Sequence, residues 1–283
     1  MFDAVVHPVP SPKPSKRPAK VPGERIYECH LGLTGHKNFK QAAEVLIPRA
    51  KRNGYTALLL IGVQECKSYA MMGAQPCAYF APCAMLGTPE DLQDFVAEAH
   101  GAGLRVYMCP SHEGAAWCDD GLPEHYFRTT SGSRDPISGA RLFDYEEPEV
   151  VRFLLSNLAY WMVEYGFDGF RFDRVSSVIY AQHGRWLPQD TEKLDEYVNN
   201  SNNVNSSAIQ YLMLATSMAE KLAQSFESGA TMIADDPTLF PGICRPIADG
   251  GLGFDLRQNS FAGLWKGLLR KSDEEWTMEE LMQ

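Results

Sequence analysis

The most informative stretch of the chain is Gly166-Phe-Asp-Gly-Phe-Arg-Phe-Asp-Arg-Val-Ser-Ser-Val-Ile-Tyr180. Its segment from Gly169 to Phe172 predicts a buried strand, and an ionisable pair, Arg171 and Asp173, stands at the end of that strand. Because side chains alternate along a strand, the arginine and the aspartate share one face. A carboxylate at a strand end with an arginine beside it is one way to hold an ionised nucleophile. The alternative is a structural salt bridge at the rim of the sheet.

Short apolar segments alternate with helical patterns on both sides of this stretch. The expected strands are 55–61, 104–108, 167–172 and 230–233, and the expected helices are 89–102, 148–165 and 209–226. This rhythm predicts a parallel sheet with right-handed crossovers. The helix that begins at Pro89 has the clearest start signal, because Thr88 can cap it, proline fits its first turn and two acidic residues follow.

The opening stretch resembles the nucleophile strand of the α-amylase superfamily, glycoside hydrolase family 13. Its continuation to Tyr180 is similar to the glycogen and starch branching enzymes, in which this segment reads Gly-Phe-Arg-Phe-Asp-Gly-Val-Thr-Ser. Further similar segments follow in the order found in those enzymes: 25–32, 87–92, 99–106, 141–145, 151–158, 211–215, 231–235, 244–246 and 250–255. So many ordered matches indicate common ancestry, although ancestry by itself does not establish that an activity is retained.

The resemblance implies an α/β fold, namely a partial (β/α)8 TIM barrel of about the first five β/α units. We expect this barrel domain over residues 24–283, preceded over 1–23 by an extended segment with a proline-rich tether at 8–22. The last strands of a branching enzyme have no counterpart in the sequence. Five strands would leave the sheet open at 26–32 and 231–234, with unpaired edges and uncovered apolar faces. Either the chain is a truncated piece of a longer product, or a protein partner covers this side.

The resemblance also assigns a site. A retaining glycosidase needs one carboxyl as nucleophile and another as general acid/base. Asp173 matches the nucleophile, and Arg171 matches its stabilising, substrate-binding partner. The acid is a glutamate in the family pattern Ile-Ala-Glu-Asp, but here Asp235 stands in its place with a shorter side chain. Since a misplacement of about 1 Å can lower a rate on the order of a hundredfold, this acid is expected to be impaired. The next residue, Asp236, is interpreted as a solvated or hydrogen-bonded group rather than a substitute acid.

Other site positions depart further from the family. Where branching enzymes read Asp-Val-Val-His-Ser-His, the chain reads Cys109-Pro-Ser-His-Glu-Gly114, so only His112 keeps a histidine. The resemblance makes His112 a substrate-binding candidate, and a surface-loop residue is the alternative. The family's sugar-stacking Gly-Tyr-His appears as Gly73-Ala-Gln75, and Arg174 replaces the glycine that follows the nucleophile. Four aromatic residues are interpreted as packing rather than as a sugar site: Trp117, Trp186, Tyr126 and Tyr180.

Composition narrows the classes of partner. The formal net charge of −10 makes a nucleic-acid partner unexpected and suits a neutral α-glucan. No apolar run approaches the roughly 20 residues of a membrane span. The 7 cysteines lack metal-ligand spacing, which favours reduced thiols, no metal site and an intracellular location in the cytoplasm or a plastid. No motif indicates a cofactor.

These observations leave three functions open. The first is a branching-enzyme-like protein of carbohydrate metabolism, inactive or impaired, that serves as a structural or α-glucan-binding subunit of a larger assembly, in other words a pseudoenzyme. The second is an active 1,4-α-glucan branching enzyme, in which Asp173 attacks the anomeric carbon and Asp235 acts as a short acid. The third is a stable piece of an assembly that has no sugar ligand.

Overall fold

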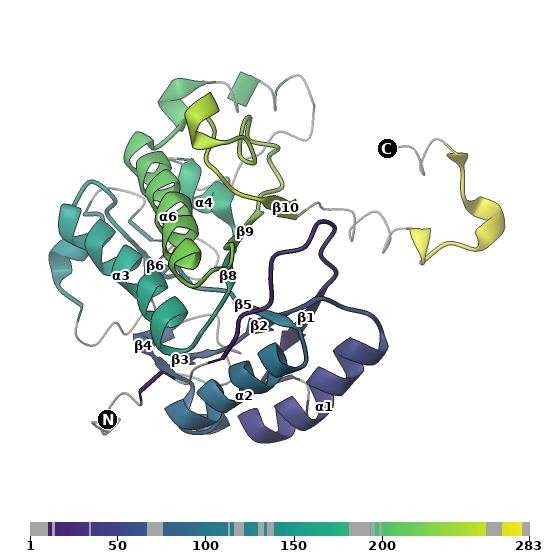
Figure 1. Ribbon diagram of the computed structural model, residues 1–283. Helices are drawn as coiled ribbons and strands as arrows, with labels where there is room; N and C mark the ends of the chain where they lie inside the picture. The colour runs from purple at the N-terminus through teal and green to yellow at the C-terminus, as the bar shows by residue number, and fades with distance from the viewer. Residues whose placement is uncertain are drawn as a thin grey trace.

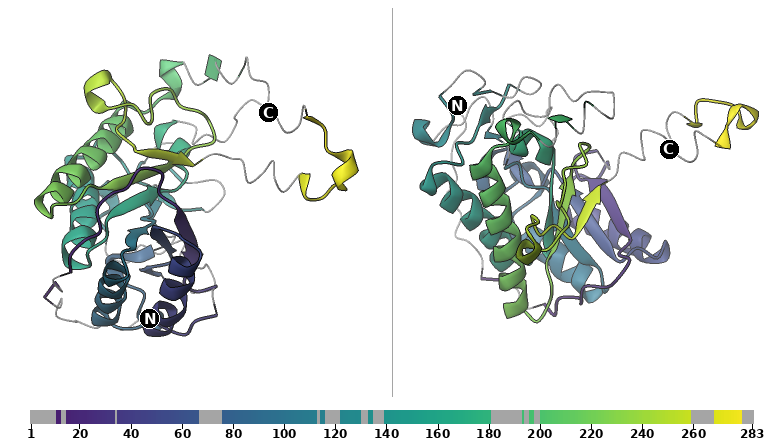
Figure 2. Two further views of the ribbon diagram at one scale, coloured as in Figure 1. Left: turned by 45° about the vertical axis from the view of Figure 1, so that its right-hand side comes forward. Right: turned by 90° about the horizontal axis from the view of Figure 1, so that it is seen from above.

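A six-stranded parallel sheet forms the centre of the molecule, in the order β1-β2-β5-β8-β9-β10 (Figure 1). The computed structural model describes residues 11–12, 15–33, 35–66, 76–112, 114–115, 122–129, 133–134, 139–180, 193, 196–197, 200–258 and 268–278. The strands of the central sheet are β1 (Ile26–His30), β2 (Ala57–Ile61), β5 (Arg105–Met108), β8 (Gly169–Phe172), β9 (Thr231–Asp235) and β10 (Leu256–Gln258). The sheet curls into part of a barrel (Figure 2), so the fold class expected from the sequence is confirmed.

Helices connect successive strands and cover the outside of the curl (Figures 1 and 2). The α-helices are α1 (Phe39–Arg52), α2 (Pro89–Gly101), α3 (Pro148–Glu164), α4 (Val175–Ile179) and α6 (Ser206–Ser225). The smaller elements are β3 (Gln64–Cys66), β4 (Pro76–Pro82), β6 (Gly114–Ala115), β7 (Arg141–Leu142) and the 3-10 helices at Ala84–Leu86, Glu124–Tyr126, Ser201–Asn203, Ile247–Asp249 and Asp273–Glu275. The main core lies between sheet and helices, where outward-facing side chains such as Phe170 and Met232 pack with Trp161 and Leu212 in one buried cluster.

The strands and helices expected around the opening stretch are confirmed, with small shifts at their ends. At the start of α2, Thr88 Oγ accepts a hydrogen bond from the Asp91 N–H (3.3 Å), and Asp91 Oδ2 accepts one from the Thr88 N–H (2.8 Å). Helix α1 was not expected, because Pro48 inside it is normally a helix breaker. The signal that could have found it is Asn38, which caps the helix by accepting a hydrogen bond from the Gln41 N–H at 2.9 Å.

The prediction that the sheet ends at residues 231–234 is wrong. Strand β10 pairs with β9 in parallel, so that Leu256 lies beside Ile233 and Gln258 beside Asp235. This strand has no apolar run, since its three residues include Arg257 and Gln258, and it therefore carries little strand signal in the sequence. The two edges of the sheet are β1 and β10.

The inside of the curl is filled rather than open. Four of its side chains, those of Ala57, Leu59, Tyr107 and Ile233, form an apolar layer and are at most 5% exposed. The prediction of uncovered apolar faces is therefore wrong for this layer. The reason is that polar side chains from opposite strands meet on both sides of it, one set at the N-terminal ends of the strands and the other at the C-terminal ends.

At the N-terminal ends, Glu24 closes the interior below the apolar layer. Its Oε1 lies 3.4 Å from Arg105 Nε, and its Oε2 accepts hydrogen bonds from the hydroxyls of Tyr107 (2.7 Å) and Thr231 (3.3 Å). Burial raises the pKa of Tyr107 well above its ordinary value. Glu24 lies two residues before β1, whereas Thr231 begins β9, so this contact joins the two sides of the curl.

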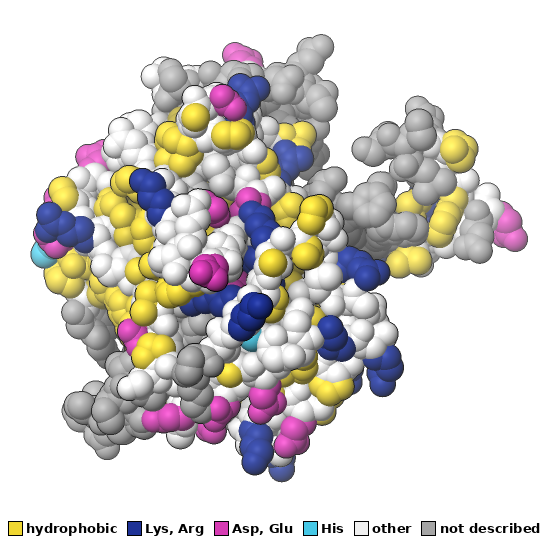
Figure 3. All heavy atoms as spheres, viewed as in Figure 1, with side chains coloured by type: hydrophobic (Ala, Val, Ile, Leu, Met, Phe, Trp, Pro, Cys, Tyr) yellow, Lys and Arg dark blue, Asp and Glu magenta, His cyan; other side chains and the backbone are white. Residues whose placement is uncertain are grey.

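The described part of the tether, residues 11–12 and 15–22, contains neither helix nor strand. It runs across the chain's own barrel near the start of the strands (Figure 2), where Lys20 Nζ donates to the Ala230 carbonyl at 2.7 Å. On the face seen in Figure 3, acidic and basic side chains are interspersed. Among the described helices, none combines the length and hydropathy needed to cross a membrane.

Candidate functional site

The two predicted catalytic carboxylates lie at the C-terminal ends of neighbouring strands. The register of β8 and β9 pairs Phe172 with Ala234, and Asp173 and Asp235 are the next residues on the two strands. Because side chains alternate, both follow Arg171 and Ile233 on the inward face. The structure therefore brings together the residues that the sequence assigned to nucleophile and acid.

Arg171 is the centre of this site. Its Nε lies 2.8 Å from Asp173 Oδ1, and its Nη1 lies 2.5 Å from Glu28 Oε2 on β1 and 3.4 Å from Gln258 Oε1 on β10. The arginine side chain is 8% exposed, whereas those of Asp173 and Glu28 are 36% and 48% exposed. Burial acts to lower the pKa of Arg171, but the neighbouring Cys109, Asp173 and Glu28 outweigh it and raise that pKa. One charged guanidinium thus joins both edges of the sheet and leaves two carboxylates open to solvent.

Glu28 and Gln258 were missed as site residues in the sequence. The available signal was a glutamate within 26–32, the segment expected at one edge of the sheet. A side chain on such a strand has to face either the covering helices or the inside of the curl. Their meeting at Arg171 depends on the curl of the sheet, which brings β1 near β10. No local sequence pattern encodes that distance.

Asp235 occupies a partly buried position beside a strained residue. Its Oδ2 accepts a hydrogen bond from the Arg174 N–H at 3.4 Å. Burial raises the pKa of Asp235; the nearby Asp173 raises it further, while the Arg174 N–H and the charge of Arg171 oppose the rise. Arg174 has φ 50° and ψ 47°, a left-handed conformation that costs an L-residue roughly 1–2 kcal/mol. The backbone keeps the bend that a glycine would make easily, and so holds the Arg174 N–H against Asp235.

The raised pKa of Asp235 leads to a prediction about stability. A carboxyl whose pKa is higher in the folded than in the unfolded protein opposes folding once it ionises. This cost is absent below the unfolded pKa, about 3.9, and is fully present above the folded pKa. Asp235→Asn, which keeps an acceptor for Arg174, is therefore expected to raise the free energy of unfolding at pH 7 and to leave it unchanged at pH 3. Urea denaturation at both pH values measures this, with the exposed Asp249→Asn as the control. An equal effect at both pH values would contradict a raised pKa for Asp235.

His112 lies beneath the site and is 1% exposed. Its Nδ1 is 2.6 Å from the Tyr211 hydroxyl, and its Nε2 is 2.9 Å from Asn157 Oδ1. Burial lowers the pKa of His112 to about 4, so the ring is neutral at physiological pH. The surface-loop alternative is therefore wrong. A substrate-binding role for this residue stays a prediction, and both of its ring nitrogens already contact protein groups.

Two more residues near the site are structural. Asp236 is 1% exposed and accepts hydrogen bonds from the N–H groups of Thr238 (3.0 Å) and Phe240 (2.9 Å), so it is the hydrogen-bonded residue that the sequence indicated. Tyr180 is fully buried, with its hydroxyl 3.2 Å from that of Thr238, in agreement with its interpretation as a packing residue.

The positions that depart from the family pattern also have structural consequences. A Cβ at Gly114 would lie 2.3 Å from the Arg141 carbonyl oxygen, so strand β6 has no room for the histidine found there in branching enzymes. Cys109 follows β5 where the family has an aspartate, and its Sγ lies 4.0 Å from Arg171 Nη2. The segment 73–75 and the residues Trp117 and Trp186 lie outside the described residues. Within the part of the chain that is described, no three His, Cys, Asp or Glu side chains are grouped to hold a metal ion.

The curled parallel sheet with carboxylates at its strand ends defines the fold class, that of the α-amylases. The chain superposes on a noncanonic maltogenic alpha-amylase from Thermotoga neapolitana with a TM-score of 0.61, at 17% identity over 91% of this chain and 53% of that one. An alpha-amylase from Geobacillus thermoleovorans gives a TM-score of 0.59, at 16% identity over 87% and 53%. At these identities the likeness establishes a shared fold.

Sequence comparison identifies the particular relatives. No protein-family model matches the chain. It is 38% identical over 275 residues to the chloroplastic/amyloplastic 1,4-alpha-glucan-branching enzyme of Oryza sativa, which is 92% of this chain and 33% of the relative. The branching enzyme of Saccharomyces cerevisiae is 34% identical over 98% of this chain and 41% of its own length. The chain is therefore a homologue of the 1,4-alpha-glucan-branching enzymes, and it spans between 33% and 41% of the length of these two relatives.

Proposed function

We propose that the chain is a branching-enzyme-like protein with impaired chemistry that serves as an α-glucan-binding or structural subunit. The observation that carries this proposal is the position of Asp235. A general acid has to reach the glycosidic oxygen of a bound glucan. Asp235 is one methylene shorter than the glutamate of branching enzymes, and its Oδ2 contacts the Arg174 N–H at 3.4 Å. Both features hold the carboxyl back toward the turn that follows β8.

The surroundings of Arg171 support the same proposal. Its Nη1 is occupied by Glu28 and Gln258, so this donor is not free for a sugar hydroxyl. Cys109 supplies no carboxylate at the end of β5, and Gly114 supplies no imidazole. The site thus keeps its nucleophile while lacking groups that would position and protonate a substrate.

Glucan binding is supported by the acceptors that remain exposed. Asp173 and Glu28 present partly open carboxylates, which can accept hydrogen bonds from sugar hydroxyls. The test is native electrophoresis through gels that contain amylopectin. The protein is expected to be retarded, Asp173→Ala less so, and the exposed variant Asp249→Ala as much as the wild type. Migration unaffected by amylopectin would contradict glucan binding and leave only the structural role.

The second candidate is an active 1,4-α-glucan branching enzyme, and a specific observation favours it. The raised pKa of Asp235 is the property that a general acid needs. In this alternative Asp173 attacks the anomeric carbon while Asp235 gives its proton to the leaving oxygen. Asp235 then takes the proton of the incoming 6-hydroxyl, which attacks the glycosyl-Asp173 ester and makes the α-1,6 branch.

A repair variant separates the two candidates. Asp235→Glu restores the length of the acid, yet we expect it to raise glucan transfer by less than about tenfold. The physical reason is that Cys109 and Gly114 still lack the groups that orient the sugar. Transfer is measured as new α-1,6 linkages in amylose, with the exposed Asp249→Glu as the matched control. A gain of about a hundredfold or more from Asp235→Glu alone would contradict the proposal.

The compartment and any protein partner are proposals as well. The Oryza sativa relative is named for the chloroplast and amyloplast, which supports an intracellular location in the cytoplasm or a plastid. The exposed residues of β10 and the edge position of β1 make these strands the proposed contact for a protein partner in a larger assembly. Protection of both strands from hydrogen exchange in the isolated monomer would contradict this contact.

A further inference from the structure

An extended basic segment, residues 15–22, crosses the barrel at the end opposite the carboxylate site; we call it the strap. Its main anchor is Arg17, whose side chain is 8% exposed. Arg17 Nη1 donates to the Phe167 carbonyl at 3.0 Å and Nη2 to the Met162 carbonyl at 2.5 Å. The guanidinium also lies 3.9 Å from the centre of the Phe226 ring and 3.9 Å from Asp168 Oδ1. This arginine therefore reaches into the connections that lead to β8 and β9.

Two further side chains fix the strap on either side of Arg17. The Ser15 hydroxyl is 2.8 Å from His100 Nδ1, at the end of α2. Lys20 Nζ donates to the Ala230 carbonyl at 2.7 Å and pairs with Asp255 Oδ1 at 2.5 Å, just before β10. The strap thus contacts the segments that lead into β5, β8, β9 and β10. We call these receiving groups the cradle: His100, Met162, Phe167, Asp168, Phe226, Ala230 and Asp255.

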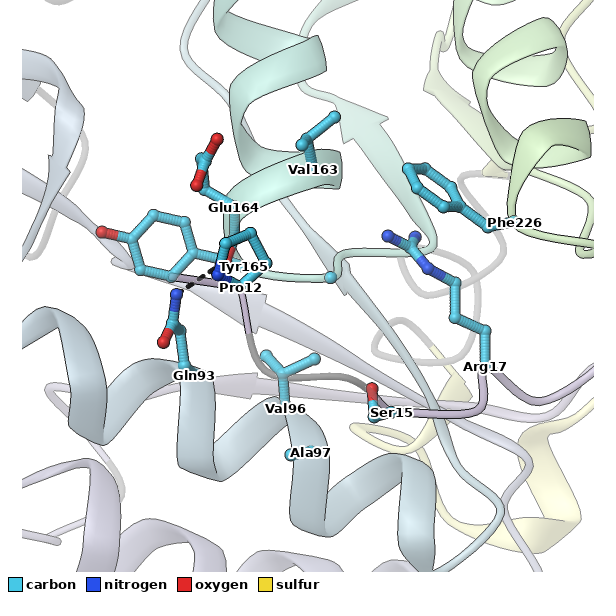
Figure 4. A pocket seen from close by; sticks show the side chains of 11 residues that line it. Pro12, Ser15, Arg17, Gln93, Val96, Ala97, Val163, Glu164, Tyr165 and Phe226 are labelled. Atoms are coloured by element: carbon cyan, nitrogen blue, oxygen red, sulfur yellow. Dashed lines mark hydrogen bonds between the residues drawn. The ribbon is translucent and has the colours of Figure 1, made fainter. Parts of the chain in front are cut away.

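The strap is held by side-chain anchors more than by close packing. Among the described residues, none of its backbone groups forms a backbone–backbone hydrogen bond. A cavity of about 190 Å³ lies between the strap and helices α2 and α3, lined by Pro12, Ser15, Val96 and Val163 among others (Figure 4). A segment docked in this way can leave and return without disturbing the barrel core.

A short hinge links the strap to the barrel. Val21, Pro22 and Gly23 are exposed, and Gly23 has φ +67° with nothing within 4 Å of the place of a Cβ. The next residue, Glu24, is fixed, because its side chain is 4% exposed and pairs with Arg105. The direction of the strap therefore depends on the left-handed turn at Gly23, a conformation that glycine adopts readily and other residues do not.

We propose that the strap is exchangeable and that two copies of the chain form a swapped dimer, in which each strap docks in the cradle of the other copy. The same side chains meet the same partners in both arrangements, so only the hinge has to change. Arg17 faces Asp168 and Lys20 pairs with Asp255, and both charge contacts are kept when the straps are exchanged. The proposal does not depend on glucan binding.

The test substitution strains the hinge at Gly23 and leaves the anchor residues Arg17 and Lys20 unchanged. Gly23→Ala puts a β-carbon on the left-handed turn, which opposes the closed monomer and leaves an extended strap unaffected. We expect its dimerisation constant to rise at least roughly tenfold over that of the wild type. Light scattering over a concentration series measures this. Removing Pro22 and Gly23, which shortens the hinge, is expected to act in the same direction.

Two controls decide whether a dimer is a strap exchange. Gly35→Ala changes another exposed glycine, with φ +76° and nothing within 4 Å of the place of its Cβ, so it adds similar backbone strain outside the hinge and is expected to leave the dimerisation constant at the wild-type value. Adding Arg17→Ala and Lys20→Ala to the Gly23→Ala variant removes the anchors and is expected to abolish its dimer. The proposal is overturned if neither hinge variant dimerises more strongly than the wild type, or if their dimer survives the loss of Arg17 and Lys20.

Discussion

Gly169→Ala is expected to lower the free energy of unfolding by about 3 kcal/mol or more. Gly169 opens β8, and a Cβ there would lie 2.0 Å from the carbonyl oxygen of Thr231 and 2.8 Å from its carbonyl carbon. Both are backbone atoms of β9, so no side chain can move aside. The strand that carries Arg171 and Asp173 would have to separate from β9. Urea denaturation monitored by tryptophan fluorescence measures the loss.

Gly101→Ala is the matched control for this substitution. Gly101 is the last residue of α2, and nothing lies within 4 Å of the place of its Cβ. We expect no loss of stability there, and a gain of up to about 1 kcal/mol from the better helix former. Equal stabilities for Gly169→Ala and the wild type would show that β8 and β9 do not pack as described.

Asp168→Ala is expected to cost about 3–5 kcal/mol. Asp168 is 1% exposed, and its Oδ2 accepts hydrogen bonds from the Val106 N–H (2.9 Å) and from His100 Nε2 (2.8 Å). Removing the carboxylate leaves both donors buried without an acceptor and takes away the anion that faces Arg17. Thermal and urea denaturation measure the cost.

Asp249→Ala serves as the control for the loss of an aspartate. Asp249 is exposed, in a 3-10 turn, and its substitution is expected to change stability by less than about 0.5 kcal/mol. A change within the same range for Asp168→Ala would show that the buried contacts of Asp168 with Val106 and His100 contribute little to stability. The contact between Arg17 and Asp168 would then contribute little as well.

The sequence was informative wherever a pattern is local. The buried strand with Arg171 and Asp173 at its end could be predicted from alternation and apolar runs, and the start of α2 from its capping residues. Helix α1 was missed because Pro48 contradicts the usual rule, and β10 because three mostly polar residues carry no strand signal. These failures have a common cause: tertiary contacts overrode a weak local preference.

The candidate site was predictable only in part, for a related reason. Asp173, Arg171 and Asp235 stand at strand ends, which the order of elements already places together. Glu28 and Gln258 join them because the sheet curls until β1 approaches β10, and this closure depends on the whole interior. The burial of His112 likewise follows from helices α3 and α6, which supply both partners of its ring. The spacing of residues in the sequence predicts neither the approach of β1 to β10 nor the partners of His112.

The central claim is that the chain keeps the carboxylates of a branching enzyme without efficient glucan transfer. The most direct measurement is the formation of new α-1,6 linkages in amylose by the purified protein, beside its Asp173→Asn variant. The account predicts that the wild type forms no more linkages than the variant. Turnover in the ordinary enzyme range of roughly 1–10³ per second, abolished by Asp173→Asn, would contradict it.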